Sequence, residues 1–311
     1  MRVALLLNPR AGTLIDRPEL LGRIPAILRE AGLDVTVITA NAAPDLPGQL
    51  EAALALRPDV LVVGGGDGTI RSAAARLAGG SVALGVVPLG TLNLLARDLG
   101  MPMEPEAAAA ALGQGVIRAI DVAEVNGEVF LCQSVIGLPN RMGLHRERVR
   151  GRGGLAARWR VVLGFARAWW RHPMLRLGLR MDDGPVLRVW TRAMSVVNNA
   201  YTEAPGQMFH RPRLDAGLLS LHVARDFDPW WLAKLLVAMA AGHWRKRPEL
   251  LSGETETLAI LSRNRHLRVM NDGEAMLLET PLRYSIRPRA LRVLAPPEAV
   301  AIGAGPAEPL G

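Results

Sequence analysis

The chain has 311 residues, of which 50% are hydrophobic, and this is enough for one or two domains with a large core. Cys132 is the only cysteine, which excludes an internal disulfide and fits a reducing compartment. The apolar start, residues 1–9, is too short for a secretory signal peptide. No uninterrupted apolar run reaches about 18 residues, so we expect no transmembrane helix.

The net charge of +8 is unevenly distributed along the chain. Residues 1–125 carry ten arginines against thirteen acids, a balance of −3, so the remainder carries +11. This asymmetry predicts that the second part of the chain meets an anionic partner, for which a membrane surface and a nucleic acid are the two candidates.

In the first part of the chain, short apolar runs alternate with segments of helical spacing. The runs predict strands, and the spaced segments, which end before glycine or proline, predict helices. In chain order the expected elements are strand Val3–Leu7, helix Leu20–Ala31, strand Leu33–Thr39, helix Leu46–Leu56, strand Val60–Val63, helix Thr69–Leu77 and strand Val82–Val87. This alternation predicts an α/β domain, residues 1–122, with a parallel sheet covered on both faces.

After about residue 122 the pattern changes to short β-like runs separated by turns. These runs are Glu128–Val135, Val186–Val197, Leu218–Val223, Leu258–Leu261, Leu267–Met270 and Leu282–Ile286. They predict a second domain, residues 123–286, that is mainly an antiparallel β-sandwich. Leu155–His172 and Trp230–Arg245 are expected as helices inserted in it. A segment of about 287–300 is expected to return to the first domain, and 303–311 form a loose tail.

The run from Gly64 to Thr69 lies directly between a predicted strand and a predicted helix. Glycines there let backbone N–H groups at a helix N-terminus approach an anion, while a tight turn without a ligand is the plain alternative. The run is neither a Walker A motif nor a good dinucleotide fingerprint. Asp67 beside bound phosphates suggests Mg²⁺ or a base, and its alternative role is to cap the helix.

These residues resemble the G-G-D-G-T signature of the diacylglycerol kinase catalytic domain family, which includes sphingosine kinases and bacterial lipid kinases. Four further segments match that family in order. They are Asn8-Pro9-Arg10-Ala11-Gly12, with Ala11 where the family has serine, Pro88 to Arg97, Asp121, and Asp272-Gly273-Glu274. The resemblance runs from residue 3 to about 295.

The resemblance implies that ATP is bound by the first domain. The residues implied for nucleotide binding are Asn8, Pro9, Gly12, Thr39, Gly65, Gly66, Asp67, Gly68, Thr69, Thr91 and Asn93. Hydroxyl and amide groups at strand ends suit this task because they orient phosphates without adding charge. Asn8 and Asn93 could equally be ordinary turn residues.

The resemblance also implies a catalytic carboxylate cluster. Glu274 matches the family's proposed base, with Asp67, Asp121 and Asp272 around it, and Asp67 and Asp121 are the expected ligands of a catalytic Mg²⁺. Phosphoryl transfer asks for such groups, because the metal neutralises charge and a carboxylate accepts the hydroxyl proton. Without the resemblance, Asn271-Asp272-Gly273 predicts only a hairpin turn.

One segment departs from the family pattern. Family members often carry a structural Mg²⁺ site in the second domain, and the matching residues here run from Arg213 to Leu218. Ala216 stands where an aspartate is expected and Asp215 lies one residue early, which puts a site built on Asp215 and Leu218 in doubt. Arg213 is a candidate source of positive charge in its place.

Two stretches of the second domain combine arginine with tryptophan. His145–Arg180 holds ten arginines and one acid, interleaved with Trp159, Phe165, Trp169 and Trp170, and the second stretch runs from Trp230 to Arg247. This composition is typical of a lipid headgroup boundary. The alternatives are tryptophans in the core with solvated arginines, or nucleic-acid binding, which we do not expect.

The sequence therefore predicts a lipid kinase that transfers the γ-phosphoryl group of ATP, with Mg²⁺, to the hydroxyl of diacylglycerol or a sphingoid-like lipid. We expect it in the cytoplasm, peripherally bound to anionic lipids, and a homodimer is left open. The alternatives are an NAD-kinase-like enzyme with a soluble substrate, which Leu94 after Asn93 argues against, and a non-catalytic lipid- or nucleotide-binding regulator. The retained Asp67 and Glu274 argue against a regulator.

Overall fold

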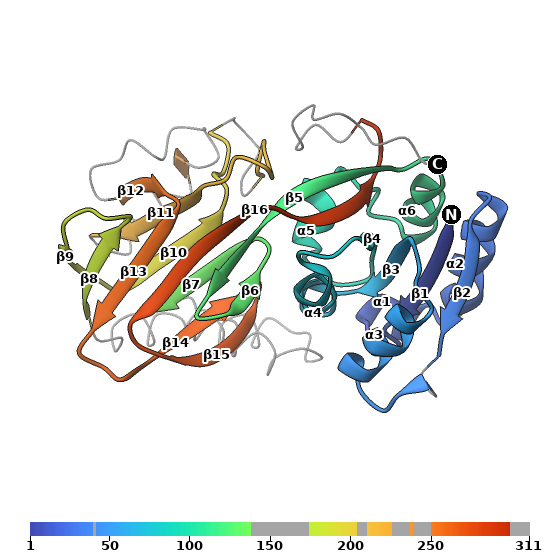
Figure 1. Ribbon diagram of the computed structural model, residues 1–311, viewed down its shortest axis with the longest axis horizontal. Coiled ribbons are helices and arrows are strands. Elements are labelled where there is room, and N and C mark those ends of the chain that lie inside the picture. The colour runs from blue at the N-terminus through green and yellow to red at the C-terminus, as the bar shows by residue number, and fades with distance from the viewer. Residues whose placement is uncertain (40–41, 138–173, 204–209, 226–236, 239–249, 299–311) are drawn as a thin grey trace. The chain divides into compact units, whose positions relative to one another are not determined.

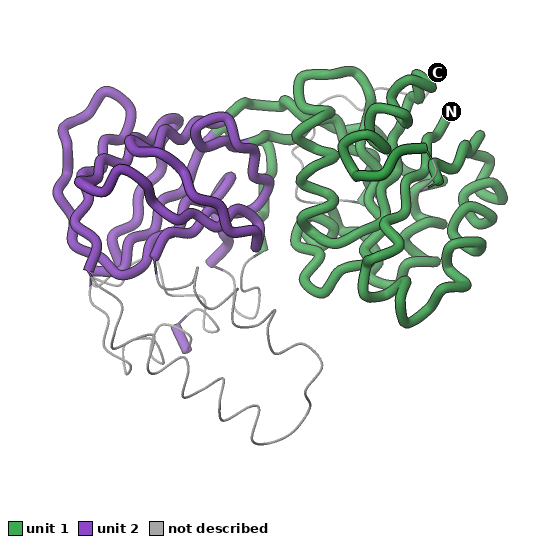
Figure 2. The backbone as a smooth tube through the Cα atoms, turned by 90° about the horizontal axis from the view of Figure 1, so that it is seen from below, with its two compact units in different colours: residues 1–122, 210–217, 287–311 green, residues 123–209, 218–286 purple. Residues whose placement is uncertain are grey.

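The computed structural model describes residues 1–39, 42–137, 174–203, 210–225, 237–238 and 250–298. The chain folds into two compact units, shown in Figure 2. Unit 1 comprises residues 1–122, 210–217 and 287–311, and unit 2 comprises residues 123–209 and 218–286. Two strands, β5 (Val116–Val125) and β16 (Leu282–Ala295), contribute residues to both units.

Unit 1 is built on a parallel sheet. Its strands are β1 (Arg2–Leu7), β2 (Asp34–Ile38), β3 (Val60–Gly65) and β4 (Ala83–Pro88), in the order β2-β1-β3-β4, and the end of β16 adds a parallel strand beside β4. The helices are α1 (Gly12–Asp16), α2 (Leu20–Glu30), α3 (Leu46–Ala55), α4 (Asp67–Leu77), α5 (Leu94–Asp98) and α6 (Pro105–Gly113). Helix α2 packs with α6 and α3 packs with α4, and right-handed crossovers place these pairs on opposite faces of the sheet (Figure 1).

The predicted α/β unit is confirmed, and the apolar runs of the sequence form buried strands, as predicted. All six residues of β3 and of β4 are buried, as expected of parallel strands covered on both faces. The largest boundary difference within the predicted helices is at α4, which begins at Asp67 rather than at Thr69. Asp67 is thus a residue of the first helical turn.

Unit 2 contains two mainly antiparallel sheets. One has the order β12 (Leu250–Thr255), β11 (Leu219–Ala224), β10 (Ala193–Asn198), β7 (Gln133–Gly137), β14 (His266–Asn271) and β15 (Glu274–Glu279). The other joins the start of β16 to β13 (Thr257–Ser262), β8 (Leu175–Met181) and β9 (Leu187–Thr191), with β5 and β6 (Glu128–Phe130) beside β16.

The two sheets of unit 2 share a single hydrophobic core. Val196 and Val269 from the first sheet lie in the same buried cluster as Leu179 and Ile260 from the second. Each such side chain contributes about 1.5–3 kcal/mol when it leaves water. The shared core makes unit 2 a β-sandwich, which confirms the predicted antiparallel second domain.

The structure divides the chain differently from the predicted boundaries in one respect. Residues 210–217 leave unit 2 and belong to unit 1, whereas the sequence predicted one uninterrupted segment, 123–286. The segment from Arg287 also belongs to unit 1. The predicted helix Leu155–His172, nearly all of the predicted helix Trp230–Arg245 and the tail 303–311 lie outside the described residues.

No helix among the described residues is both long enough and apolar enough to span a membrane.

Candidate functional site

Three strand ends meet in unit 1 at the carboxyl edge of the parallel sheet. The backbone N–H of Asn8, after β1, donates to the carbonyl of Gly64 at 2.8 Å, and the N–H of Leu89, after β4, donates to the carbonyl of Gly65 at 3.1 Å. The glycine loop that follows β3 therefore lies between two other predicted site segments. Ligands of open α/β sheets bind at this edge.

The glycine loop and the loop after β4 approach too closely for side chains. A Cβ atom added to Gly90 would lie 2.5 Å from the Cα of Gly66 and 2.9 Å from Oδ1 of Asn93. A Cβ atom added to Gly65 would lie 2.7 Å from the Cβ of Thr69. The two backbones are thus held in direct contact, which explains glycine at these positions without any appeal to a left-handed φ angle.

We expect a Gly90→Ala variant to displace the glycine loop, because its methyl group would overlap the backbone of Gly66. Overpacking of this kind costs roughly 1–3 kcal/mol. The expected result is a lower Tm together with weaker binding of ATP, the nucleotide that the resemblance implies, measured by calorimetry. Gly22→Ala is the matched control, because a Cβ at Gly22 meets nothing within 4 Å and lies on the surface of α2. Unchanged Tm and ATP affinity in Gly90→Ala would contradict the close contact.

The N-terminus of α4 presents backbone N–H groups to the loop region. Gly66 is the N-cap and carries no side chain to bond the first turn, and the first helical hydrogen bond runs from the N–H of Ile70 to the carbonyl of Gly66. Within the described part of the chain, no group accepts a hydrogen bond from the N–H of Gly68 or Thr69. Exposed N–H groups at a helix N-terminus, together with the helix dipole, form an anion-binding site.

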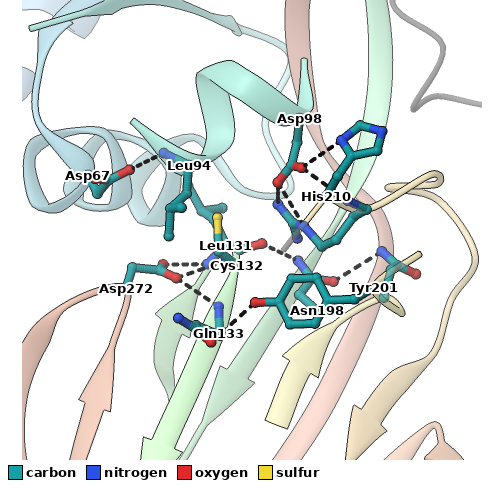
Figure 3. A network of polar contacts seen from close by, with 12 residues as sticks. Asp67, Leu94, Asp98, Leu131, Cys132, Gln133, Asn198, Tyr201, His210 and Asp272 are labelled. Atoms are coloured by element: carbon teal, nitrogen blue, oxygen red, sulfur yellow. Dashed lines mark hydrogen bonds and ion pairs between the residues drawn. The ribbon is translucent and has the colours of Figure 1, made fainter. Parts of the chain in front are cut away.

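Asp67 connects the glycine loop to α5. Its Oδ1 accepts the N–H of Leu94 at 2.7 Å (Figure 3). Its Oδ2 accepts the backbone N–H of Asn93 at 3.0 Å. Burial of the side chain raises the pKa of Asp67, although these two N–H groups and the charge of Arg97 act in the opposite direction. The carboxylate therefore bonds another loop and does not cap α4, which was its alternative role.

Asn8 and Asn93 order the loops on either side of Asp67. Nδ2 of Asn8 donates to Oγ1 of Thr69 at 2.9 Å, so Asn8 orients that hydroxyl. Asn93 has a left-handed backbone with φ of 49°, and its side-chain amide bonds both the N–H and the carbonyl of Gly90. Asn93 is thus a turn residue, as its alternative interpretation proposed, and also a partner of Asp67.

The other residues predicted for nucleotide binding lie around these loops. Pro9 and Gly12 follow β1 and are exposed, with open space where a Cβ of Gly12 would lie. Thr91 is exposed in the loop after β4. Thr39 is exposed at the end of β2, which is separated from β3 by β1.

Asp121, predicted as a catalytic and metal-binding carboxylate, is used in unit 1 to bind backbone. It is 1% exposed, its Oδ2 accepts the N–H of Gly217 at 2.7 Å, and its Oδ1 accepts the N–H of Arg289 at 2.8 Å. Asp121 therefore ties β5 to residues 210–217 and to β16. Both of its oxygens are engaged in holding the unit together.

Asp272, another predicted catalytic residue, makes similar contacts in unit 2. Its carboxylate accepts the N–H groups of Leu131 at 2.6 Å, of Cys132 at 2.9 Å and of Gln133 at 2.9 Å (Figure 3). Its own N–H donates to the carbonyl of Gln133. Asp272 thus fastens the β14–β15 hairpin to the connection between β6 and β7.

Glu274, the predicted base, is the first residue of β15 and is exposed. It pairs with Asn271 across a two-residue turn in which Asp272 and Gly273 have φ angles of 48° and 93°. Two positive φ angles are the mark of a type I′ hairpin turn, so the hairpin predicted from Asn-Asp-Gly is formed. The contacts of Asp272 fix this hairpin and hence the start of β15, where Glu274 lies.

A buried ion pair in unit 1 was missed by the sequence analysis. Arg211, 1% exposed, donates to Asp98 from Nε at 2.9 Å, from an Nη at 2.6 Å and from its backbone N–H at 3.2 Å. Burial raises the pKa of Asp98, but the Arg211 charge together with hydrogen bonds from His210 and Arg211 outweighs it, so the net shift is downward. No sequence signal distinguishes Arg211 from the other arginines of the chain.

Among the described residues, no group of three or more His, Cys, Asp or Glu side chains could hold a metal ion. The predicted pair Asp67 and Asp121 is therefore not part of such a cluster there. Any Mg²⁺ at the glycine loop would take most of its ligands from a bound nucleotide and from water.

Comparisons with known proteins match both halves of the chain. The model of the diacylglycerol kinase catalytic domain matches residues 2–125, and the model of the YegS C-terminal NAD kinase beta sandwich-like domain matches residues 158–295. Among solved structures, a putative diacylglycerol kinase from Bacillus anthracis gives a TM-score of 0.71 at 22% identity, covering 95% of this chain and 97% of that one. An NAD kinase from Archaeoglobus fulgidus in complex with ATP gives 0.53 at 14% identity, with 96% of each chain covered. These two similarities concern the fold.

Curated relatives of this chain are named as lipid kinases or diacylglycerol kinases. A probable lipid kinase YegS-like protein of Pseudomonas aeruginosa is 43% identical over 119 residues, which is 38% of this chain and 39% of that relative's length. One of Pseudomonas fluorescens is 29% identical over 279 residues, 88% of this chain and 90% of the relative. A diacylglycerol kinase of Mycobacterium tuberculosis is 36% identical over 128 residues, 41% of either protein. The first part of the chain, residues 2–125, is thus similar to the diacylglycerol kinase catalytic domain, and residues 158–295 are similar to the YegS C-terminal domain.

Proposed function

We propose that this protein transfers the γ-phosphoryl group of ATP to the hydroxyl group of a lipid. The observation that carries the proposal is the glycine loop of unit 1, where the N-terminus of α4, with two N–H groups that have no acceptor among the described residues, lies between the ends of β1 and β4. This arrangement suits a polyphosphate, because backbone N–H groups and a helix dipole stabilise the phosphate charge.

The chain's own groups have separate tasks in this proposal. The N–H groups of Gly68 and Thr69 bind phosphate oxygens, while Asn8 holds the Thr69 hydroxyl in one orientation. The close approach of Gly66 and Gly90 leaves no room for a side chain at Gly90. Asp67 keeps the loop after β4 against the start of α4.

Asp67 is also the residue that we propose to face Mg²⁺. Each of its oxygens accepts one backbone N–H and retains a second lone pair, so the carboxylate can still act as an acceptor. When bound, Mg²⁺ supplies charge neutralisation on the transferred phosphate. Glu274 is the proposed acceptor of the hydroxyl proton, because it is the exposed carboxylate of the D-G-E segment.

A basic, tryptophan-bearing face of unit 2 supports a lipid as the acceptor. On β8 and β9 the buried residues alternate with exposed ones, and the exposed set includes Arg176, Arg180, Arg188 and Trp190. The guanidinium of Arg176 lies 4.5 Å from the ring centre of Trp190, which is 56% exposed. Arginine and tryptophan together suit the headgroup region of an anionic membrane. The stretch 145–173 and the Trp230–Arg247 cluster, predicted for the same contact, lie outside the described residues.

We expect the protein to bind phosphatidylglycerol-containing vesicles and to lose that binding as salt is added. Arg176→Ser and Trp190→Ser should each weaken vesicle binding roughly fivefold in a flotation assay, since one arginine near such a surface is worth about 1 kcal/mol. Arg263→Ser is the control, because it removes the same charge from an exposed turn outside β8 and β9. Equal binding to neutral and anionic vesicles would count against the membrane contact.

The acceptor can be identified with labelled ATP and a panel of lipids. The panel should contain diacylglycerol, a sphingoid base, phosphatidylglycerol and a polyprenol, with NAD as the soluble alternative. We expect phosphate transfer to at least one lipid and none to NAD. Transfer to NAD alone would overturn the proposal and favour the kinase class whose fold this chain shares.

A further inference from the structure

Residues 210–217, here called the return segment, are held in unit 1 by contacts with Asp98 and Asp121. Arg211 forms the buried ion pair with Asp98 at the end of α5. The N–H of Asp121 donates to the carbonyl of Leu214 at 2.7 Å, and its Oδ2 accepts the N–H of Gly217. The ends and the middle of the segment are therefore all anchored.

The side chains of this region do not fit the structural Mg²⁺ that the family resemblance implies. Asp215 is only 4% exposed, and its carboxylate is paired with Arg213 at 3.1 Å and with Arg289 at 3.8 Å. Ala216 has no ligand atom in its side chain. Mg²⁺ requires several oxygen ligands in near-octahedral geometry, and its carboxylate ligands cannot be shared freely with guanidinium groups.

The region nevertheless contains a positive charge, which is the guanidinium group of Arg211. Arg211 is the largest fully buried side chain among the described residues, and it is paired with Asp98. Nε and an Nη of the guanidinium, together with the backbone N–H, converge on the two oxygens of Asp98. A guanidinium is suited to this position because it stays charged when buried and donates in a fixed geometry.

We propose that the buried guanidinium of Arg211 provides the positive charge that fastens the return segment, so that this chain needs no structural divalent metal there. The side chain and the backbone N–H of Arg211 both donate to Asp98, so the ion pair holds the main chain of the return segment in place. Arg213, the replacement considered from the sequence, instead pairs with Asp215 inside the return segment itself, so this pair does not join the segment to the rest of unit 1.

Because Asp98 is the last residue of α5, the Asp98–Arg211 pair also holds the end of that helix in place. Helix α5 ends at Asp98 and begins at Leu94, whose N–H is bound by Asp67 (Figure 3). The five-residue helix is therefore fixed at one end by the glycine loop and at the other by Arg211. Short helices are not stable alone, so α5 depends on both contacts.

Thermal unfolding of the nucleotide-free protein tests the proposal without any assay of activity. We expect the same Tm in excess EDTA, in excess MgCl₂ and in excess CaCl₂, because a ligand that binds the folded state would raise Tm with its concentration. A saturable rise of Tm with either metal, matched by metal binding in calorimetry, would overturn the proposal.

Substitutions test whether Arg211 is the cation that matters. Arg211→Met should lower Tm by roughly 10 °C, because it leaves the buried Asp98 beside His210 but without the guanidinium that neutralises it. Adding Asp98→Asn to this variant should restore more than half of the loss, whereas Arg213→Met should lower Tm by much less than Arg211→Met does, because Asp215 keeps Arg289 as a second partner. Additive losses for Asp98→Asn and Arg211→Met, or an Arg213→Met loss equal to that of Arg211→Met, would show that the segment is held otherwise.

Discussion

An Asp67→Asn variant is expected to lose ATP-dependent phosphorylation by roughly 10³-fold, which is the upper range for removing one preorganised electrostatic group from an active site. Asparagine keeps the shape of the side chain but offers one acceptor oxygen instead of two. Its amide group would face the N–H of either Asn93 or Leu94, which needs an acceptor. The charge that we propose to act on Mg²⁺ is also removed.

The fold is expected to survive this substitution because of the sign of the Asp67 pKa shift. An acid whose pKa is raised in the folded state binds a proton more readily when folded. The free energy of unfolding therefore falls as pH rises from the ordinary pKa of 3.8 through the raised value, and the full penalty is present above it. At neutral pH the uncharged asparagine escapes that penalty, which offsets part of the lost hydrogen bonding.

The measurement is a comparison of kcat and of Tm in the same preparations. Asp45→Asn is the matched control, since it makes the same chemical change at the N-cap of α3, where asparagine also caps well. We expect full activity in the control and a Tm change of a few degrees in Asp67→Asn. Full turnover in Asp67→Asn would refute the proposed role of this carboxylate.

The sequence was most informative about unit 1, because its elements are encoded locally. Buried parallel strands such as β3 and β4 appear as continuous apolar runs, and the helices between them end at glycine or proline. In unit 2, β15 has mostly exposed or half-buried residues, so it lacks the alternation that reveals a strand. The return of residues 210–217 to unit 1 depends on the distant partners Asp98 and Asp121, which no local pattern can show.

At the candidate site, the sequence located several carboxylates but did not show which groups they bind. Motif resemblance located Asp67, Asp121 and Asp272, but their tasks depend on which backbone N–H groups point at them. Asp121 and Asp272 each bind main-chain groups of segments remote in sequence. Asp98 and Arg211 were not found at all, because a charged residue looks solvent-exposed until its buried partner is known.

Glu274→Gln is expected to lower kcat by roughly 10²–10⁴-fold while the KM for ATP changes little, since general-base catalysis contributes an effect of this size. Glutamine has the same length and cannot take up a proton from the acceptor hydroxyl. Glu274 is exposed at the start of β15, and the hairpin that carries it is fixed by Asp272. The free energy of unfolding should therefore change by less than about 0.5 kcal/mol, as for other exposed substitutions.

Glu279→Gln supplies the control for this experiment. Glu279 ends the same strand, is exposed, and loses only a surface ion pair with Arg265 when neutralised. Asp272→Asn should differ from both, because it weakens three backbone contacts of the hairpin and so lowers Tm along with kcat. If Glu274→Gln had a normal kcat while Asp67→Asn were inactive, Glu274 would not be the base. The proposed phosphate site in unit 1 would still be supported. The two carboxylates can thus be tested independently.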